Sequence, residues 1–443
     1  MAVTSVLGIE ADVRARHKEM GERTRYCPSA IYDPHDPAFL DEASTRRDLA
    51  ATLGRCVGCE RCVDYCAVFP GLFVLLERVA DRDPERMTPA QQDDLVDECH
   101  QCRRCVEACI EGSDDDAASV DLPRMIVRSM AMRLEHGHVS VGYRRATRTL
   151  SRRHAVARLP AGAPGSWRRR WGQLATGISA HRRLPERVGS PVRGASAPSA
   201  ARTGEAAGVV VLTCNEGQPI ADAVIDLLTR AGVRCQDSGL ECCGAATLYG
   251  GDVARFADVA SNVVARLSAH VRDGCDVVVA ESSCAAVLRE YLVDHVDRHQ
   301  RDDAELVASA VYDVLDYLDA LDGSPTLFDS AIAPHHVIVQ RAARAGADDA
   351  TIRLLARAGA TVHAVDQPVG AAGAWRLRAT NDERVEGLDR ALADEMALAL
   401  TAHPDADLVA ESSLAALAIE ERLGRPAEHV LCWLARHARP PKL

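Results

Sequence analysis

The sequence has few aromatic residues, no long apolar segment and no excess of basic charge. Phenylalanine, tyrosine and tryptophan make up 4% of the 443 residues although 47% are hydrophobic, so we expect a helix-rich structure packed on small side chains. No apolar run approaches the roughly 20 residues that span a bilayer, and Val209–Leu212 is typical of the short runs that occur. Lysine and arginine total 52 against 64 acidic residues, which argues against nucleic acid as a partner of the whole chain.

Two kinds of short signal are also missing. The segment Met1–Glu10 has no basic stretch followed by an apolar one, so we expect a cytoplasmic protein with reduced thiols rather than a secreted one. No glycine-rich dinucleotide fingerprint and no phosphate-binding loop follows a predicted strand. A flavin or nicotinamide cofactor would therefore have to be bound by another chain.

Cysteine, by contrast, is abundant, with 16 residues. In a long chain without a secretion signal, this abundance indicates metal ligands rather than a disulfide framework. Eight of the cysteines form two runs with the same spacing, Cys-x2-Cys-x2-Cys-x3-Cys. The first run is Cys56, Cys59, Cys62 and Cys66, and the second is Cys99, Cys102, Cys105 and Cys109.

This spacing is that of chains binding two 4Fe-4S clusters, in which the fourth cysteine of each run binds the other cluster. The predicted ligands are Cys56, Cys59, Cys62 and Cys109 for one cluster, and Cys99, Cys102, Cys105 and Cys66 for the second. The alternative is structural zinc, which usually takes two separated Cys-x-x-Cys pairs; four cysteines within eleven residues fit it poorly. Around the runs we expect helices over Pro89–Glu98, with Thr88 and Gln91 as its capping residues, and over Pro123–Glu135.

A basic segment follows. From Arg144 to Pro185 there are eleven arginines and no acidic residue, and a stretch rich in Ser, Ala, Pro and Gly continues to Gly204. This composition predicts a linker with a short helix. Trp167 and Trp171 would share one face of that helix, with arginines between them. Such a face could contact an anionic membrane surface or an acidic partner, or the segment could be a solvated connector.

The C-terminal half alternates predicted strands with predicted helices, which indicates an α/β unit with parallel strands. The predicted elements of the first unit are a strand at Val209–Leu212, a helix at Ile220–Arg230, a strand at Val233–Gln236, a helix at Val253–His270, a strand at Asp276–Ala280 and a helix from Ala285. The unit then repeats. Residues 227–232 return in similar form at 354–359, and residues 279–286 return at 409–416.

The predicted fold class is therefore α + α/β, with an N-terminal α-helical two-cluster ferredoxin module followed by a duplicated Rossmann-like α/β domain. The expected divisions are an extension over 1–48, the ferredoxin module over 49–143, the arginine-rich linker over 144–204, the first α/β unit over 205–325 and the second over 326–443.

Four further cysteines of the first unit lie at or after the ends of predicted strands, where they could bind a metal together. Cys214 follows the first strand, Cys242 and Cys243 lie in the loop after the second, and Cys284 ends the third. The carboxyl ends of parallel strands meet at one edge near helix N-termini, which favour thiolates. We therefore predict a third metal site, either an Fe-S cluster or zinc. Glu281 could add a carboxylate ligand or cap a helix.

The second unit lacks these cysteines. Pro368–Gly370 takes the place of the Cys-Cys-Gly sequence, Leu414 takes the place of Cys284, and the strand around Val337–Arg341 carries no cysteine. This unit is predicted to be a scaffold without a metal. The remaining cysteines, Cys27, Cys235, Cys275 and Cys432, are interpreted as ordinary thiols, most often buried. His335 and His336 are interpreted as surface histidines rather than ligands.

The two-cluster module followed by a duplicated Cys-Cys-Gly domain resembles the iron-sulfur subunit of anaerobic glycerol-3-phosphate dehydrogenase. It is also similar to the glycolate oxidase iron-sulfur subunit, the lactate-utilisation iron-sulfur protein and the iron-sulfur subunits of heterodisulfide reductase. The resemblance covers about Arg55–Pro440. In the first α/β unit it rests on Thr213–Asn215, Glu241–Gly244 and Ser282–Cys284.

The resemblance implies an electron-relay subunit of an oxidoreductase complex rather than a stand-alone catalyst, and it assigns no catalytic residue. Its clusters would connect a partner dehydrogenase, a flavoprotein, to a quinone or another acceptor, in the cytoplasm or on the inner face of the membrane. The loss of the second Cys-Cys-Gly set argues against the paired clusters that split a heterodisulfide. The alternatives are a redox sensor or scaffold that binds through the arginine-rich linker, and a protein with structural zinc at the C-terminal cysteines.

Overall fold

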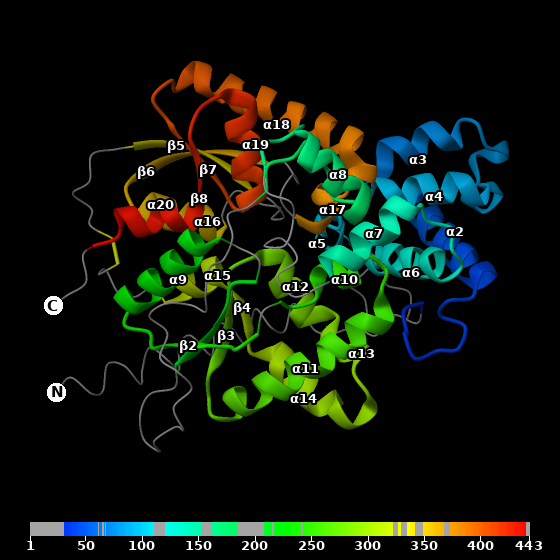
Figure 1. The fold of residues 1–443 in the computed structure, drawn as a ribbon, viewed down its shortest axis with the longest axis horizontal. Helices are drawn as coiled ribbons and strands as arrows, with labels where there is room; N and C mark the ends of the chain where they lie inside the picture. Colours follow the sequence, from blue (N-terminus) through cyan, green and yellow to red (C-terminus); the bar gives the residue numbers. More distant parts are fainter. Residues whose placement is uncertain are drawn as a thin grey trace.

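The computed structural model combines a helical N-terminal region with a mixed α/β region built on parallel sheets (Figure 1). It describes residues 31–60, 62–63, 66, 68–107, 109, 120–151, 162–184, 208–214, 217–240, 242–321, 327–328, 335–341, 349–366 and 373–439. The helical region, drawn in blue and cyan, lies to one side of the α/β region.

The helices of the N-terminal region surround one apolar core. They are α2 (Glu42–Cys59), α3 (Val68–Leu76), α4 (Pro89–Glu98), α5 (Arg104–Glu107) and α6 (Leu122–Glu135), with short 3-10 turns at Ala80–Arg82 and Pro84–Arg86. Leu53, Leu72 and Met125 are buried in this core. The predicted capping box of α4 is confirmed, because the Thr88 hydroxyl accepts from the Gln91 amide and the Gln91 side chain accepts from the Thr88 amide.

The first α/β unit forms a parallel sheet in the order β2-β1-β3-β4. Its elements are β1 (Val209–Leu212), α9 (Gln218–Arg230), β2 (Cys235–Asp237), α10 (Ala245–Leu248), α11 (Val253–Arg272), β3 (Asp276–Val279), α12 (Ser282–Glu290), α13 (Leu292–His295), a 3-10 turn (Arg298–Gln300), α14 (Arg301–Ser309), β4 (Val311–Asp313) and α15 (Val314–Ala320). All four residues of β1 are buried, as expected of a strand covered on both faces.

Several predicted bounds in this unit need correction, among them the start of α9, which lies at Gln218 rather than Ile220. The second strand begins at Cys235 rather than Val233. The helix predicted from Ala285 begins at Ser282, so Cys284 lies in the first turn of α12 and does not end the strand. This places the Cys284 side chain at a helix N-terminus.

The second α/β unit forms a parallel sheet in the equivalent order, β6-β5-β7-β8. Its elements are β5 (His335–Arg341), α16 (Ala350–Arg357), β6 (Ala360–Asp366), α17 (Gly373–Leu377), a 3-10 turn (Ala379–Asn381), α18 (Asp382–Ala402), β7 (Asp407–Ala410), α19 (Ser413–Leu423), β8 (Ala427–His429) and α20 (Val430–His437). Leu212 lies opposite Val279 in the first sheet, and Val339 lies opposite Val409 in the second.

The two units share a core between their sheets. Helices α9 and α15 of the first unit pack against α20 and α16 of the second. Val211, Leu228, Leu355 and Trp433 are buried together in this layer. The units are therefore joined through apolar side chains and form one continuous body.

The segment predicted as a linker contains two helices, α7 (Val141–Leu150) and α8 (Trp167–Thr176). Helix α7 begins before residue 144 and buries Ala146 and Leu150 against Leu377 and Leu414 of the second unit. Trp167 and Trp171 lie on α8, and each side chain is 68% exposed.

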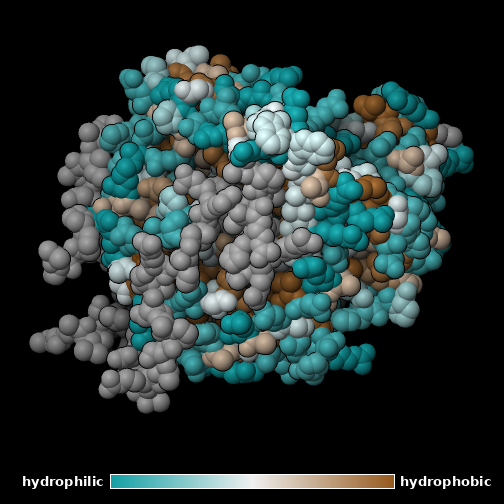
Figure 2. All heavy atoms as spheres, viewed as in Figure 1, coloured by the Kyte–Doolittle hydropathy of each residue, from teal (hydrophilic) through white to brown (hydrophobic). Residues whose placement is uncertain are grey.

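The viewed face of the molecule is mainly hydrophilic, and its hydrophobic side chains gather in small separate groups (Figure 2). Within the ranges that the structure describes, no helix combines the length and the apolar character needed to cross a membrane.

Candidate metal centres

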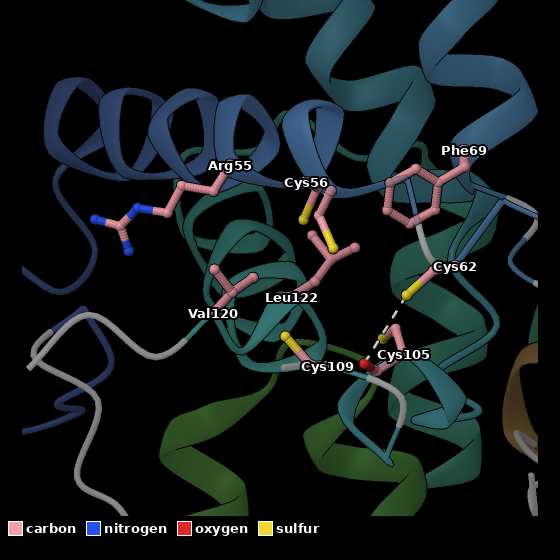
Figure 3. A pocket seen from close by; sticks show the side chains of 9 residues that line it. Arg55, Cys56, Cys62, Phe69, Cys105, Cys109, Val120 and Leu122 are labelled. Carbon is pink, nitrogen blue, oxygen red and sulfur yellow. Dashed lines mark hydrogen bonds between the residues drawn. The ribbon is translucent and has the colours of Figure 1, made fainter. Parts of the chain in front are cut away.

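The first thiol group surrounds a cavity in the helical region (Figure 3). Cys56 and Cys59 lie at the end of α2, Cys62 in the turn that follows, and Cys109 shortly after α5. These four, together with Cys105, line a cavity that opens to solvent. The structure therefore brings together all four thiols predicted to bind one cluster.

The electrostatics of this group suit a bound cation. Burial raises the pKa of Cys56 to about 12, and the nearby Cys109 and Cys62 thiols contribute to the shift in the same direction. Thiols crowded in this way resist ionisation unless positive charge compensates them, and a coordinated metal supplies that charge. The donor set thus fits an iron-sulfur cluster, whose irons are held by four thiolates.

The second thiol group lies between the end of α4 and α5. Cys99 ends α4, Cys105 lies in α5 and Cys102 lies between them. Burial raises the pKa of Cys105, and Cys66 is the neighbouring thiol that contributes most to the same shift. Cys66 also adds to the raised pKa of Cys99. The fourth cysteine of the first run therefore lies among the thiols of the second run, as the crossed pattern requires.

The backbone around Cys102 is held in an uncommon conformation. Gln101 and Arg103 have φ angles of 57° and 61°, a left-handed region that costs a non-glycine residue of order 1–3 kcal/mol. In return, the Gln101 amide donates a hydrogen bond to Cys99 Sγ at 3.4 Å. Contacts with the rest of the protein must therefore hold the loop in this backbone conformation.

These contacts are made with the two α/β units. The Arg103 guanidinium donates to the Tyr291 hydroxyl at 2.9 Å and forms an ion pair with Glu290, both in the first unit. Arg104 donates to the carbonyl oxygen of Asp366 in the second unit at 3.2 Å. The loop that carries the second thiol group is thus held by both units.

A third thiol group stands at the carboxyl edge of the first sheet. Cys214 follows β1, Cys243 precedes α10 and Cys284 lies in the first turn of α12. Their sulfur atoms all lie within 4.8 Å of one another. Because β1 and β3 are neighbours in the sheet, the residues after them meet at one edge. Cys242 is outside this close set, but its thiol interacts with Cys214 and Cys243.

The thiols of this group shift one another's pKa in opposite directions. Hydrogen bonds from Cys214, Cys242 and Cys284 lower the pKa of Cys243 well below its usual value, against the effect of burial. The Ala245 amide also donates to Cys243 Sγ at 3.5 Å. A cluster of adjacent thiols is a soft donor set, which suits zinc or iron.

Glu281 adjoins this group. It occupies the N-cap position of α12, where its carbonyl oxygen accepts from the Cys284 and Ala285 amides. Its carboxylate makes no capping hydrogen bond and accepts from the Ser283 hydroxyl at 3.3 Å. Glu281 therefore caps the helix, but through its backbone carbonyl rather than its side chain.

The corresponding edge of the second unit carries charge instead of thiols. The strand register places Arg341 where the first unit has Cys214, and Arg341 forms 2.6 Å ion pairs with Asp349 and Asp366. Leu414, at the position of Cys284, is buried against α7. In the described part of this unit Cys432 is the one cysteine, and Pro368–Gly370 lies outside the described residues.

The remaining cysteines join none of these groups. Cys235 and Cys275 are buried and Cys432 is half-buried, while Cys27 lies outside the described residues. Among the described cysteines there is no disulfide.

The sequence did not predict the roles of Arg103, Glu290 and Tyr291, because Arg103 and Tyr291 are 188 positions apart and share no motif.

Comparison with known proteins identifies the class of the N-terminal region. Residues 49–110 match the family model of the 4Fe-4S dicluster domain. No curated protein and no solved structure matches the chain. The matched segment contains all eight cysteines of the first two groups. The chain is therefore an iron-sulfur protein with a domain that binds 4Fe-4S clusters, and this domain indicates a role in electron transfer.

Proposed function

We propose that the chain is the electron-transfer subunit of an oxidoreductase complex, relaying electrons between a partner flavoprotein dehydrogenase and a quinone or other acceptor. The match to a dicluster domain supports the relay, and the lack of a nucleotide-binding fingerprint in the sequence supports a separate catalytic chain. The proposed ligands are Cys56, Cys59, Cys62 and Cys109 for one cluster, and Cys99, Cys102, Cys105 and Cys66 for the other.

The observation that carries this proposal is that Cys66 lies near Cys99 and Cys105 of the second run, while Cys109 lies near Cys56 of the first. Bound at these groups, 4Fe-4S clusters take up and release single electrons, and the crossed ligands keep the two groups adjacent. The first group borders a cavity open to solvent, whereas the loop of the second contacts both α/β units through Arg103 and Arg104. We therefore place the partner's electron exchange at the first group.

The third group is proposed as a further metal site at the inner end of this route. Arg103, in the second thiol loop, contacts Glu290 and Tyr291 at the end of α12, and the first turn of α12 holds Cys284.

We propose that the two units arose as a duplicated Rossmann-like Cys-Cys-Gly domain, since their strand orders are equivalent, and that only the first kept its metal.

Anaerobic purification, followed by iron, sulfide and zinc analysis and low-temperature EPR, tests the proposal. About eight irons per chain would correspond to two cubanes, and about twelve to a third cluster, at four irons each. Zinc lost in the Cys214→Ser/Cys284→Ser variant, with eight irons retained, would assign zinc to the third group. Colourless, iron-free protein would refute the proposal.

A second candidate function is supported by α8, which could attach the chain to an anionic membrane surface. Trp167, Trp171 and Leu174 are 68%, 68% and 60% exposed, and their spacing places them on one helical face. Arg168 and Arg170 are exposed beside them. An apolar face bordered by basic side chains is typical of helices that lie on anionic bilayers.

Vesicle co-sedimentation separates this candidate from the relay. Trp167→Ala/Trp171→Ala and Arg168→Gln/Arg170→Gln should release the chain from vesicles containing phosphatidylglycerol and leave its reduction by an artificial donor unchanged. Arg169 must be retained, because its buried guanidinium donates to the carbonyl oxygens of Ser179 and Arg182. A redox sensor would instead lose vesicle binding when its iron is removed.

A further inference from the structure

Three histidines of the second unit lie side by side, away from every thiol group. His336 is on β5, His363 is on β6 and His403 directly follows α18. Their ring nitrogens all lie within 4.8 Å of one another, and His336 Nδ1 is 3.1 Å from His363 Nε2. This cluster lies towards the start of β5, whereas Arg341, in the position of Cys214, lies at its end.

The strand register explains the cluster. Ile338 on β5 lies opposite His363 on the parallel strand β6, and side chains two apart on a strand share a face. His336, Ile338 and His363 therefore face the same side of the sheet. Helix α18 covers this side, because Ile338 packs with Met396, and the residue after α18 is His403.

The geometry approaches that of a metal site. In a tetrahedral zinc site with bonds of about 2.0–2.1 Å, two imidazole nitrogens lie about 3.3 Å apart, close to the spacing of His336 and His363. The three rings are stacked, with centroids 3.8 Å apart for His363 and His403 and 4.4 Å apart for His336 and His403. His336 is exposed, so an ion from solvent can reach the cluster.

The three adjacent rings accommodate one shared metal ion better than a proton on each ring. Burial, then the neighbouring His403 and His336, lower the pKa of His363. Neutral imidazole is the form that metals bind. Three adjacent protonated rings would repel one another, whereas one metal ion attracts all three nitrogens.

We propose that His336, His363 and His403 form a binding site for a divalent transition-metal ion of the zinc class, with a fourth coordination position open to water. Its three nitrogen ligands distinguish it from the all-sulfur groups of the chain. The ion would tie the end of α18 to β5 and β6. The proposal is independent of the electron-transfer function.

Zinc titration of the cluster-loaded protein by calorimetry tests the site. His363→Ala removes one of the three rings, and His335→Ala is the matched control, because His335 neighbours His336 on β5 but contacts His437. The wild type and His335→Ala should bind one more zinc ion than His363→Ala, or bind it at least about tenfold more tightly. Removing a residue that only hydrogen-bonds to a metal ligand already weakens metal binding by about tenfold or more, so removing a ligand should cost at least as much. The thiol groups are common to all three proteins and cancel in the comparison.

Thermal unfolding provides a second readout. Zinc should raise the Tm of the wild type and of His335→Ala, because a ligand of the folded state stabilises it, and should not raise that of His363→Ala. His336→Ala, which changes an exposed ring, should reproduce the loss if His363→Ala folds poorly. Equal zinc stoichiometry and affinity in the wild type and both cluster variants would overturn the proposal.

Discussion

At the scale of single residues, Arg103 has a role that its place between two cysteines does not indicate. Its backbone is left-handed, with φ 61°, and its side chain is 10% exposed. The guanidinium reaches Tyr291 and Glu290 in a different unit. Arg103 therefore links the shape of the second thiol loop to the position of α12.

Replacing Arg103 with alanine should destabilise the folded protein by about 3–5 kcal/mol, because the change leaves a partly buried carboxylate and a buried hydroxyl without their partner. Chemical denaturation of the cluster-loaded protein measures the loss. The control is Arg86→Ala, whose ion pairs with Asp81 and Asp83 are exposed and contribute about 1 kcal/mol or less. Equal losses in both variants would contradict the role given to Arg103.

His295 should make stability depend on pH. It is buried with Nε2 2.9 Å from the Tyr32 hydroxyl, and burial lowers its pKa to about 3. The unfolded chain takes up a proton below about pH 6.5, whereas the folded chain does so only near pH 3, so stability is lost as the pH falls through this window. The loss amounts to about 2 kcal/mol at pH 5, from about 1.5 pH units at 1.36 kcal/mol each.

The His295→Gln variant tests this dependence, because glutamine keeps a polar partner for Tyr32 but does not titrate. Between pH 7.5 and pH 5 its unfolding free energy should fall about 2 kcal/mol less than that of the wild type. His299→Gln, at an exposed position, should follow the wild type. Parallel pH profiles for all three proteins would show that His295 does not titrate on unfolding.

At the scale of elements, the sequence predicts best where a local signal fixes the element. The capping residues of α4 and the apolar run of β1 are such signals, and both elements appear with the predicted bounds. Helix α12 begins three residues earlier than predicted. Its N-cap is Glu281, which makes no side-chain cap, so the sequence carries no capping signal there.

The loop of the third thiol group depends on its glycine. Gly244 has φ 88°, and a Cβ there would lie 2.8 Å from Phe256 and 2.9 Å from Val259. Gly244→Ala should therefore destabilise the protein by about 2–5 kcal/mol, combining left-handed strain of about 1–2 kcal/mol with overpacking of about 1–3 kcal/mol. It should also weaken metal retention at the third thiol group, measured by metal analysis after gel filtration.

Gly387→Ala is the matched control for this substitution. Gly387 lies within α18, and no atom lies within 4 Å of an added Cβ. Alanine there should stabilise the helix by about 0.5–1 kcal/mol. Thermal unfolding should thus move in opposite directions for the two variants, and a shift of the same sign would contradict the explanation.

At the scale of the whole molecule, the second thiol loop connects the helical region to both α/β units. Besides the arginine contacts, the His100 ring lies 4.5 Å from the Trp375 ring of α17, and Glu98 forms a 2.6 Å ion pair with Arg384 of α18. A metal-held loop would therefore support distant parts of the second unit.

Removing iron with a chelator should accelerate hydrogen exchange in α17 and at the end of β6, because His100 and Arg104 lose their fixed positions when the thiol loop relaxes. Helix α14, which packs on α11 and α13, should keep its protection. Mass spectrometry of the two forms measures the difference. Unchanged exchange in α17 would show that the loop keeps its contacts without metal.

Spacing along the chain was enough to predict the features that depend on near neighbours. Two cysteine runs indicate cluster binding because ligands of one cluster lie close along the chain, and the family match over 49–110 supports that interpretation. Alternating strands and helices predicted the α/β region in the same way. The crossed ligand assignment and the domain boundaries stay predictions.

Pairs of residues that are distant in the chain became visible only in the folded molecule. Folding placed Arg103 beside Tyr291, Arg341 at the edge where the first unit has thiols, and His403 against His336 and His363. Such contacts arise when helices pack on sheets and join residues far apart in the chain. They leave no period or spacing in the sequence, because each partner alone is an ordinary arginine, tyrosine or histidine.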